Sequence, residues 1–126
     1  MRLLLDTFAL IYALTRPDDL GTEARGALVD TGADVYFSPA SVWEIEIKTA
    51  LGKLPPVAAD IATAARVQGF SELAIVSAHA QMAGRLPLLH RDPFDRMLVA
   101  QALVEGLTVV TPDELFASYG VPVMRC

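Results

Sequence analysis

The sequence has 126 residues, 53% of them hydrophobic, which predicts a single domain over residues 1–126 with a packed core. Fifteen acidic residues against ten basic ones give a net charge of −5, which disfavours a protein that holds nucleic acid by positive charge alone. A protein that gathers its acids around divalent cations is not excluded, because two such ions would neutralise four of the five excess charges.

The first predicted element is a strand over RLLLD, residues 2–6, because a short continuous apolar run is typical of a buried strand. Asp6 falls where an export signal would need an apolar residue, so we expect a protein that stays in the cytoplasm. TFALIYALT follows with helical spacing and ends at RPDDLG. A second helix is predicted over residues 22–30 and a strand over DVYFS, residues 34–38.

The next segment, SPASVWEIEIKTALGKL, carries the signals of a complete helix. Ser38 is the expected N-cap, Pro39 takes the first helical position and Gly52 ends the helix. PPVAADIATAARVQG predicts a further helix that is entered through its prolines and stopped by Gly69.

The remaining elements alternate in the same way. A strand is predicted over ELAIVS, residues 72–77, and then a short helix capped by Ser77, with His79 on its surface. A helix over residues 93–105 ends at Gly106. LTVVT and VPVMR predict two more strands around the short helix PDELFASYG. The only cysteine is the last residue of the sequence, so no internal disulfide is expected.

Strands that alternate with helices indicate a mainly parallel sheet with helices on both faces, and therefore a three-layer α/β/α sandwich. No apolar run approaches the ~20 residues that a membrane span requires. In an open parallel sheet, ligands bind outside the carboxyl ends of the strands, so this edge is the place to look for a site.

Five acidic residues from four separate segments are expected at that edge. Asp6 ends the first strand, and Asp113 follows LTVVT by two residues. Glu44 lies in the second turn of the helix that leaves DVYFS. Asp92 and Asp95 lie in the first turn of the helix that leads into LTVVT, and such a helix must begin near the carboxyl edge.

Each acid also has a structural interpretation. DPFD and TPDE resemble capping sequences worth about 1 kcal/mol each, with Thr111 as the cap of the second, and Asp6 can cap the helix after it. Glu44 precedes Lys48 by four residues, which suits a helical ion pair. A cap occupies one carboxylate oxygen, so capping and metal binding can coexist.

Convergence changes the interpretation of these acids, because like charges within about 5 Å repel by a few kcal/mol. A hard divalent cation relieves that repulsion, and ligation by oxygen alone suits Mg²⁺ or Mn²⁺. Such ions on carboxylates are typical of phosphoryl chemistry. Basic side chains near the acids are candidates for an RNA path or for a solvated helix face: Lys48, Lys53, Arg85, His90, Arg91 and Arg96. Trp43 is expected in the core or in a dimer contact, and His90 in a plain loop.

Four blocks, LLLDTFALIYAL, SPASVWEIEIKTALGKL, HRDPFDRMLVAQALVEG and VVTPDELF, together resemble the PIN-domain ribonuclease toxins of VapC type across nearly the whole chain. The resemblance implies a Mg²⁺- or Mn²⁺-dependent ribonuclease whose metal-binding and catalytic acids are Asp6, Glu44, Asp95 and Asp113. Asp92 is an additional candidate ligand. Similar toxins often have a histidine where this chain has Phe8, so any role of that histidine is absent.

The resemblance also implies partners. These are a VapB-like antitoxin whose tail covers the active site, a second copy of the chain in a homodimer, and an RNA substrate such as transfer or ribosomal RNA. Two other interpretations remain. One is a catalytically silent protein of the same fold that binds an antitoxin or nucleic acid without cleaving. The other is a receiver domain with an acidic pocket, which lacks support because its paired acids and late lysine are not in register.

Overall fold

The computed structural model describes residues 1–126 and contains one five-stranded sheet with the strand order β3-β2-β1-β4-β5. Every neighbouring pair of strands is parallel, which confirms the expected sheet. The strands are β1 (Arg2–Leu5), β2 (Asp34–Phe37), β3 (Ser71–Glu72), β4 (Thr108–Thr111) and β5 (Val123–Arg125).

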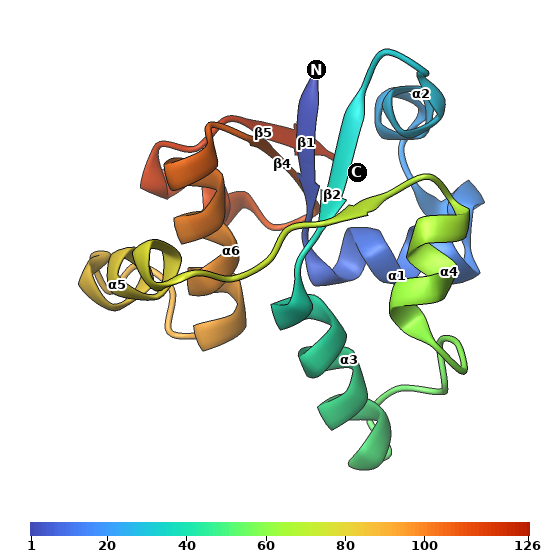
Figure 1. The fold of residues 1–126 in the computed structure, drawn as a ribbon, viewed down its shortest axis with the longest axis horizontal. Coiled ribbons are helices and arrows are strands. Elements are labelled where there is room, and N and C mark those ends of the chain that lie inside the picture. Colours follow the sequence, from blue (N-terminus) through green and yellow to red (C-terminus); the bar gives the residue numbers. More distant parts are fainter.

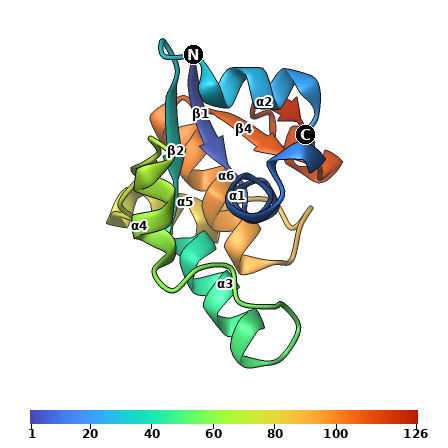
Figure 2. The same ribbon diagram turned by 90° about the vertical axis from the view of Figure 1, so that its right-hand side faces the viewer.

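Helices cover both faces of this sheet and complete the predicted three layers. The helices α1, α2 and α4 lie on one side, and α5 and α6 on the other (Figure 1). The helix α3 follows β2 and extends away from the sheet (Figure 2). The α-helices are α1 (Thr7–Thr15), α2 (Thr22–Val29), α3 (Pro39–Ala50), α4 (Ile61–Val67), α5 (Ser77–Arg85) and α6 (Pro93–Glu105), with 3₁₀ helices η1 (Pro17–Asp19) and η2 (Glu114–Tyr119).

The central strand β1 connects the two halves of the core. Side chains alternate along a strand, so Leu3 and Leu5 face the cluster under α1, α2 and α4, while Leu4 faces the opposite cluster. All three leucines are fully buried. On the second face, α6 contributes Leu98 and Val99 to the packing. No helix is long and apolar enough to cross a membrane.

The helix α6 has the bounds that its sequence predicts. The Asp92 carboxylate accepts a hydrogen bond from the Phe94 backbone N–H at 2.9 Å, and Pro93 starts the helix. Gly106 ends it with a φ of 69°, in the left-handed region. These local signals suffice because each acts within one helical turn.

A substitution at Gly106 tests this helix end. Gly106→Ala is expected to lower the free energy of unfolding by about 1 kcal/mol, because a Cβ disfavours the left-handed conformation. Chemical denaturation measures the change. The matched control is Gly26→Ala within α2, where open space surrounds the added methyl, and there we expect no loss or a small gain in stability. Equal losses at both glycines would contradict the explanation.

Three predicted elements are wrong in extent. The strand predicted over residues 72–77 is only the two-residue β3, because it pairs with β2 alone at the edge and the chain then leaves the sheet toward α5. The fourth helix begins at Ile61 rather than at the prolines, since the Asp60 side chain caps it through the Thr63 N–H at 3.0 Å. The short helix η2 is capped by Asp113 rather than Thr111.

His79 is also wrongly predicted, because it is buried, with 1% of its surface exposed. Its Nδ1 accepts the Val76 backbone N–H at 3.1 Å, and its Nε2 lies 2.9 Å from the Glu105 carboxylate. The N-cap of α5 is therefore Val76 rather than Ser77. The imidazole joins α5 to the end of α6, a long-range pairing that no local pattern encodes.

Candidate metal centre

The five predicted acids meet beyond the carboxyl ends of the strands. Asp6 directly follows β1 and Asp113 follows β4 by two residues, while α3 leaves β2 and α6 leads into β4. The charges of Glu44 and Asp113 raise the pKa of Asp6, and those of Asp92, Glu44 and Asp6 raise the pKa of Asp95. Acids from four segments are thus close enough to repel one another.

Asp6 is the most deeply buried of these acids, with 1% of its surface exposed. One carboxylate oxygen caps α1 by accepting the Ala9 N–H at 2.8 Å, and the other accepts the Thr111 hydroxyl at 2.5 Å. The net pKa of Asp6 is raised to about 6: burial raises it most strongly, the two hydrogen bonds lower it, and the charges of Asp113 and Glu44 raise it.

Glu44 is 4% exposed and is held by two side chains. The Thr7 hydroxyl donates to its Oε1 at 2.6 Å, and Lys48 Nζ lies 2.8 Å from its Oε2. The predicted ion pair is therefore present, inside the cluster. The hydrogen bond to Glu44 raises the pKa of Lys48, and the charges of Asp92 and Asp95 act in the same direction. Lys48 is thus a positive charge of the site.

Asp95 faces the interior of the cluster, whereas Asp92 serves the helix. The net pKa of Asp95 is raised to about 7. Burial is the largest cause, the charge of Asp92 also raises the pKa, and the charge of His90 lowers it. One Asp92 oxygen caps α6 through the Phe94 N–H at 2.9 Å. The Asp95 carboxylate accepts no capping hydrogen bond, and its Oδ2 faces the His90 ring.

His90 enters the cluster from the loop before α6. Its Nε2 lies 3.0 Å from Asp95 Oδ2 and 3.1 Å from Asp113 Oδ2. One ligand atom from each of these three residues lies within 4.8 Å of the other two, which defines a candidate metal site. The prediction of a plain loop residue was wrong. The only sequence signal was its place directly before Arg91 and Asp92, which does not show where the ring points.

Arg96 serves this loop and not an RNA path. Its guanidinium donates four hydrogen bonds to backbone carbonyl oxygens, at 2.8 to 3.3 Å. The acceptors belong to Ala83, Leu86, Pro87 and His90. Lys53, Arg85 and Arg91 are exposed and remain candidates for contacts with RNA.

Three helices have their N-terminal ends near the acidic cluster. Asp6 caps α1, Ser38 caps α3 and Asp92 caps α6. The N-terminal end of a helix carries a partial positive charge, which favours nearby carboxylates. Five carboxylates still outnumber Lys48, and this excess of oxygen donors suits a hard divalent cation. The residues present therefore fit Mg²⁺ or Mn²⁺.

Trp43 lies beside the cluster and not in the core, since 65% of its surface is exposed. Its ring meets Phe94 edge to face, with the centroids 5.3 Å apart. Together with Pro39, Ile75 and Met97, the two rings line an apolar hollow. Of the two expected positions, the core is wrong, because Trp43 lies on the outward side of α3, and the dimer contact stays a prediction.

Comparisons with known proteins agree with the fold described above. Residues 3–122 match the family described as "PIN domain". No curated protein matches the sequence. Among solved structures, the chain is similar to VapBC2 from Rickettsia felis bound to a promoter DNA fragment, with 15% identity and a TM-score of 0.73 over 99% of this chain and 98% of that one.

Two further structures show the same fold. The chain is similar to DNA-bound VapBC from Salmonella typhimurium, with 18% identity and a TM-score of 0.68, covering 99% of this chain and 98% of that one. It is also similar to FitAcB from Neisseria gonorrhoeae, with 23% identity and a TM-score of 0.65, covering 97% and 96%.

Proposed function

The chain belongs to the PIN domain family, and from this premise we propose that it is a VapC-type toxin that hydrolyses RNA phosphodiester bonds with the help of Mg²⁺ or Mn²⁺. The observation that carries the proposal is the convergence of acids from four segments. Burial, and after it the charges of the neighbouring acids, act to raise the pKa of Asp6 to about 6 and of Asp95 to about 7. Structurally similar proteins are VapBC and FitAB complexes, which favours a toxin over other nucleases.

In this proposal Asp6, Glu44, Asp95 and Asp113 hold the metal, and Asp92 adds negative charge beside them. The bound cation supplies an activated water and a counter-charge for the phosphate. The chain's own residues orient the acids: the Thr111 hydroxyl fixes Asp6, and Lys48 fixes Glu44. The same lysine lies at the rim, where a phosphate would arrive.

The test compares two glutamates of α3. Glu44→Gln is expected to lower metal-dependent cleavage of transfer or ribosomal RNA by about a hundredfold or more, because it removes a buried charge that faces the acids. Glu46→Gln, two residues away and exposed, should leave cleavage unchanged. Gel analysis of RNA with Mn²⁺, Mg²⁺ or EDTA measures both, and sequencing of RNA ends in cells that express the chain identifies the bond. Cleavage that persists in EDTA or in Glu44→Gln would refute the proposal.

One observation favours the silent alternative, in which the fold binds without cleaving. Both oxygens of Asp6 and both oxygens of Glu44 already have protein partners. Calorimetric titration with Mn²⁺ separates the two functions, since no binding at millimolar metal would favour the silent protein. A receiver domain is not supported, because the sheet order β3-β2-β1-β4-β5 differs from the 2-1-3-4-5 order of that fold.

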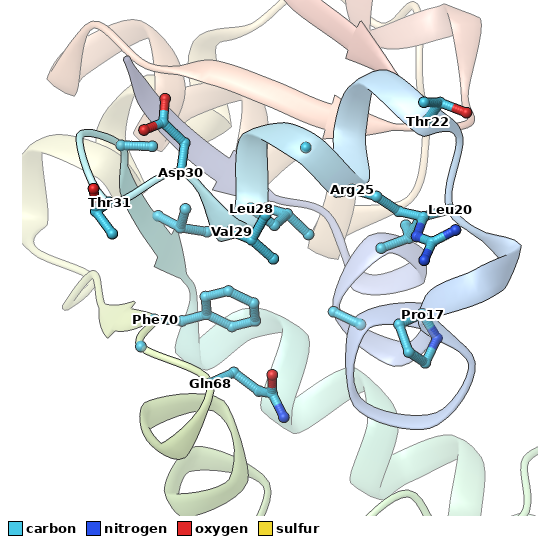
Figure 3. Close-up of a pocket in the computed structure, with 15 residues that line it drawn as sticks. Pro17, Leu20, Thr22, Arg25, Leu28, Val29, Asp30, Thr31, Gln68 and Phe70 are labelled. Atoms are coloured by element: carbon cyan, nitrogen blue, oxygen red, sulfur yellow. The ribbon is translucent and has the colours of Figure 1, made fainter.

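We also propose a VapB-like antitoxin and a second copy of the chain as partners. An apolar groove of about 840 Å³ lies between η1, α2 and the segment before β3, away from the acids. Leu28, Val29 and Phe70 point into it, and Arg25 lies at one end (Figure 3). A groove of this kind suits an amphipathic segment of a partner protein. The exposed hollow around Trp43 suits the contact between copies.

A further inference from the structure

The imidazole of His90 stands among the carboxylates as the one nitrogen donor of the metal cluster. Its Nε2 lies 3.0 and 3.1 Å from the nearest oxygens of Asp95 and Asp113. In an octahedral site with bonds of about 2.1 Å, neighbouring ligand atoms lie about 3 Å apart. Both nitrogen–oxygen pairs thus have the spacing of adjacent ligands around one cation, and all three ligand atoms lie within 4.8 Å of one another.

We propose that His90 Nε2 is a direct metal ligand beside Asp95 and Asp113, and that this nitrogen makes the site prefer Mn²⁺ to Mg²⁺. This inference rests on the proposed function, because it concerns the same site. Mg²⁺ takes oxygen ligands almost exclusively, whereas imidazole binds first-row transition metals well. A site made of carboxylates alone would lack this cause of a higher affinity for Mn²⁺ than for Mg²⁺.

The loop that carries His90 is held at several points. The Tyr119 hydroxyl accepts the His90 backbone N–H at 2.7 Å and donates to the Pro87 carbonyl at 3.0 Å. Arg96 donates to the carbonyl oxygens of Pro87 and His90 in this loop, and to those of Ala83 and Leu86 at the end of α5. Tyr119 and Arg96 are therefore positioning residues, because they act on the cluster through His90.

Hydrogen bonds of the imidazole oppose metal binding and define its cost. His90 Nδ1 accepts the Asp92 backbone N–H at 3.3 Å, which places the ring proton on Nε2, where it faces the oxygens of Asp95 and Asp113. Coordination through Nε2 moves that proton to Nδ1, so the number of protons is unchanged, but the contact with Asp92 and the Nε2–H contacts with both carboxylates are lost. At 3.3 Å the contact with Asp92 lies beyond the usual range for such bonds and is weak. Bonds from the imidazole and both carboxylates to the cation replace the contacts that Nε2 loses.

Pulsed electron paramagnetic resonance of the Mn²⁺-loaded protein tests the bond directly. A ligating imidazole produces ¹⁴N modulation, which should change to the ¹⁵N pattern when histidine is labelled with ¹⁵N. The chain has only two histidines, and His79 is buried between α5 and α6. His90→Gln should therefore abolish the modulation. By calorimetry, the same variant is expected to lower Mn²⁺ affinity about tenfold and to change Mg²⁺ affinity much less.

Tyr119→Phe removes the hydroxyl and keeps the ring, so it serves as the second variant. It should weaken Mn²⁺ binding in the wild-type background and have no additional effect beside His90→Gln, because it acts through that histidine. If the losses of Mn²⁺ affinity add up in the double variant, Tyr119→Phe has a general effect on folding, and its positioning role is overturned. Bound Mn²⁺ without ¹⁴N modulation would overturn the inference while leaving the proposed nuclease intact. Failure of Mn²⁺ and Mg²⁺ to bind at all would refute both.

Discussion

Asp6→Asn is expected to abolish RNA cleavage, with a loss of about a thousandfold or more, and at the same time to stabilise the metal-free protein. Activity falls because the central acid of the cluster loses its charge. Stability rises because burial and two neighbouring acids disfavour the ionised form, with a pKa of about 6 against the ordinary 3.8. That difference corresponds to a gain of about 3 kcal/mol in the free energy of unfolding at neutral pH.

The amide preserves the local hydrogen bonds that the carboxylate makes. Its oxygen still accepts the Ala9 N–H, and its nitrogen donates to the Thr111 hydroxyl, which reverses its own role. Thermal unfolding in EDTA and RNA cleavage in Mn²⁺ measure the two effects on the same preparation. Loss of stability together with activity would show that Asp6 is a structural residue.

Asp60→Asn is the matched control, since Asp60 also caps a helix through its side chain. It is fully exposed, and the hydrogen bonds of its cap lower its pKa instead of raising it. Asparagine is a comparable N-cap, so neither activity nor stability should rise. A stabilisation of this variant equal to that of Asp6→Asn would show that the gain comes from the cap and not from the cluster.

The metal-free protein is expected to become less stable as pH rises from 5 to 8, by about 4 kcal/mol or roughly 15 °C in Tm. The folded-state pKa values of Asp6 and Asp95 are about 6 and about 7, both above the ordinary 3.8. The folded protein therefore holds protons that the unfolded chain releases above pH 4. Each contribution is complete below the ordinary pKa of 3.8 and is lost progressively as pH rises to the folded pKa, about 6 for Asp6 and about 7 for Asp95.

Mn²⁺ should reverse this trend, because the metal binds the ionised carboxylates and stabilises the folded state by mass action. We expect a larger rise in Tm with Mn²⁺ at pH 8 than at pH 5. Calorimetric scans across this range, with EDTA or Mn²⁺, make the comparison. A Tm that increases with pH in EDTA would contradict the assigned shifts, since paired surface carboxylates would then dominate.

The sequence sufficed for features that act over one or two helical turns. The bounds of α6, the caps at Asp6, Ser38 and Asp92, and the pair of Glu44 with Lys48 are as predicted, because each depends on residues within four positions of one another. The alternation of strands and helices also placed the acids at one edge, since parallel topology leaves little choice.

Features that depend on distant contacts were missed. His90, Arg96 and His79 contact residues through loops or across α5 and α6, and a histidine or arginine in the sequence is equally compatible with the surface. The length of β3 is set by its position at the sheet edge, which the six-residue segment ELAIVS does not reveal. Trp43 was expected in the core or in a dimer contact; it lies outside the core, and the dimer contact stays a prediction.

The pairing of β1 with β4 has a consequence during synthesis. Thr111, whose hydroxyl binds Asp6, lies 105 residues further along the chain. While a ribosome is still extending the polypeptide, β1 lacks its β4 neighbour and the first acids lack Asp95, Asp113 and the α6 terminus. Translation of most of the chain therefore yields no complete cluster of acids. For the nuclease proposed above, activity would then arise only once the whole domain has been made.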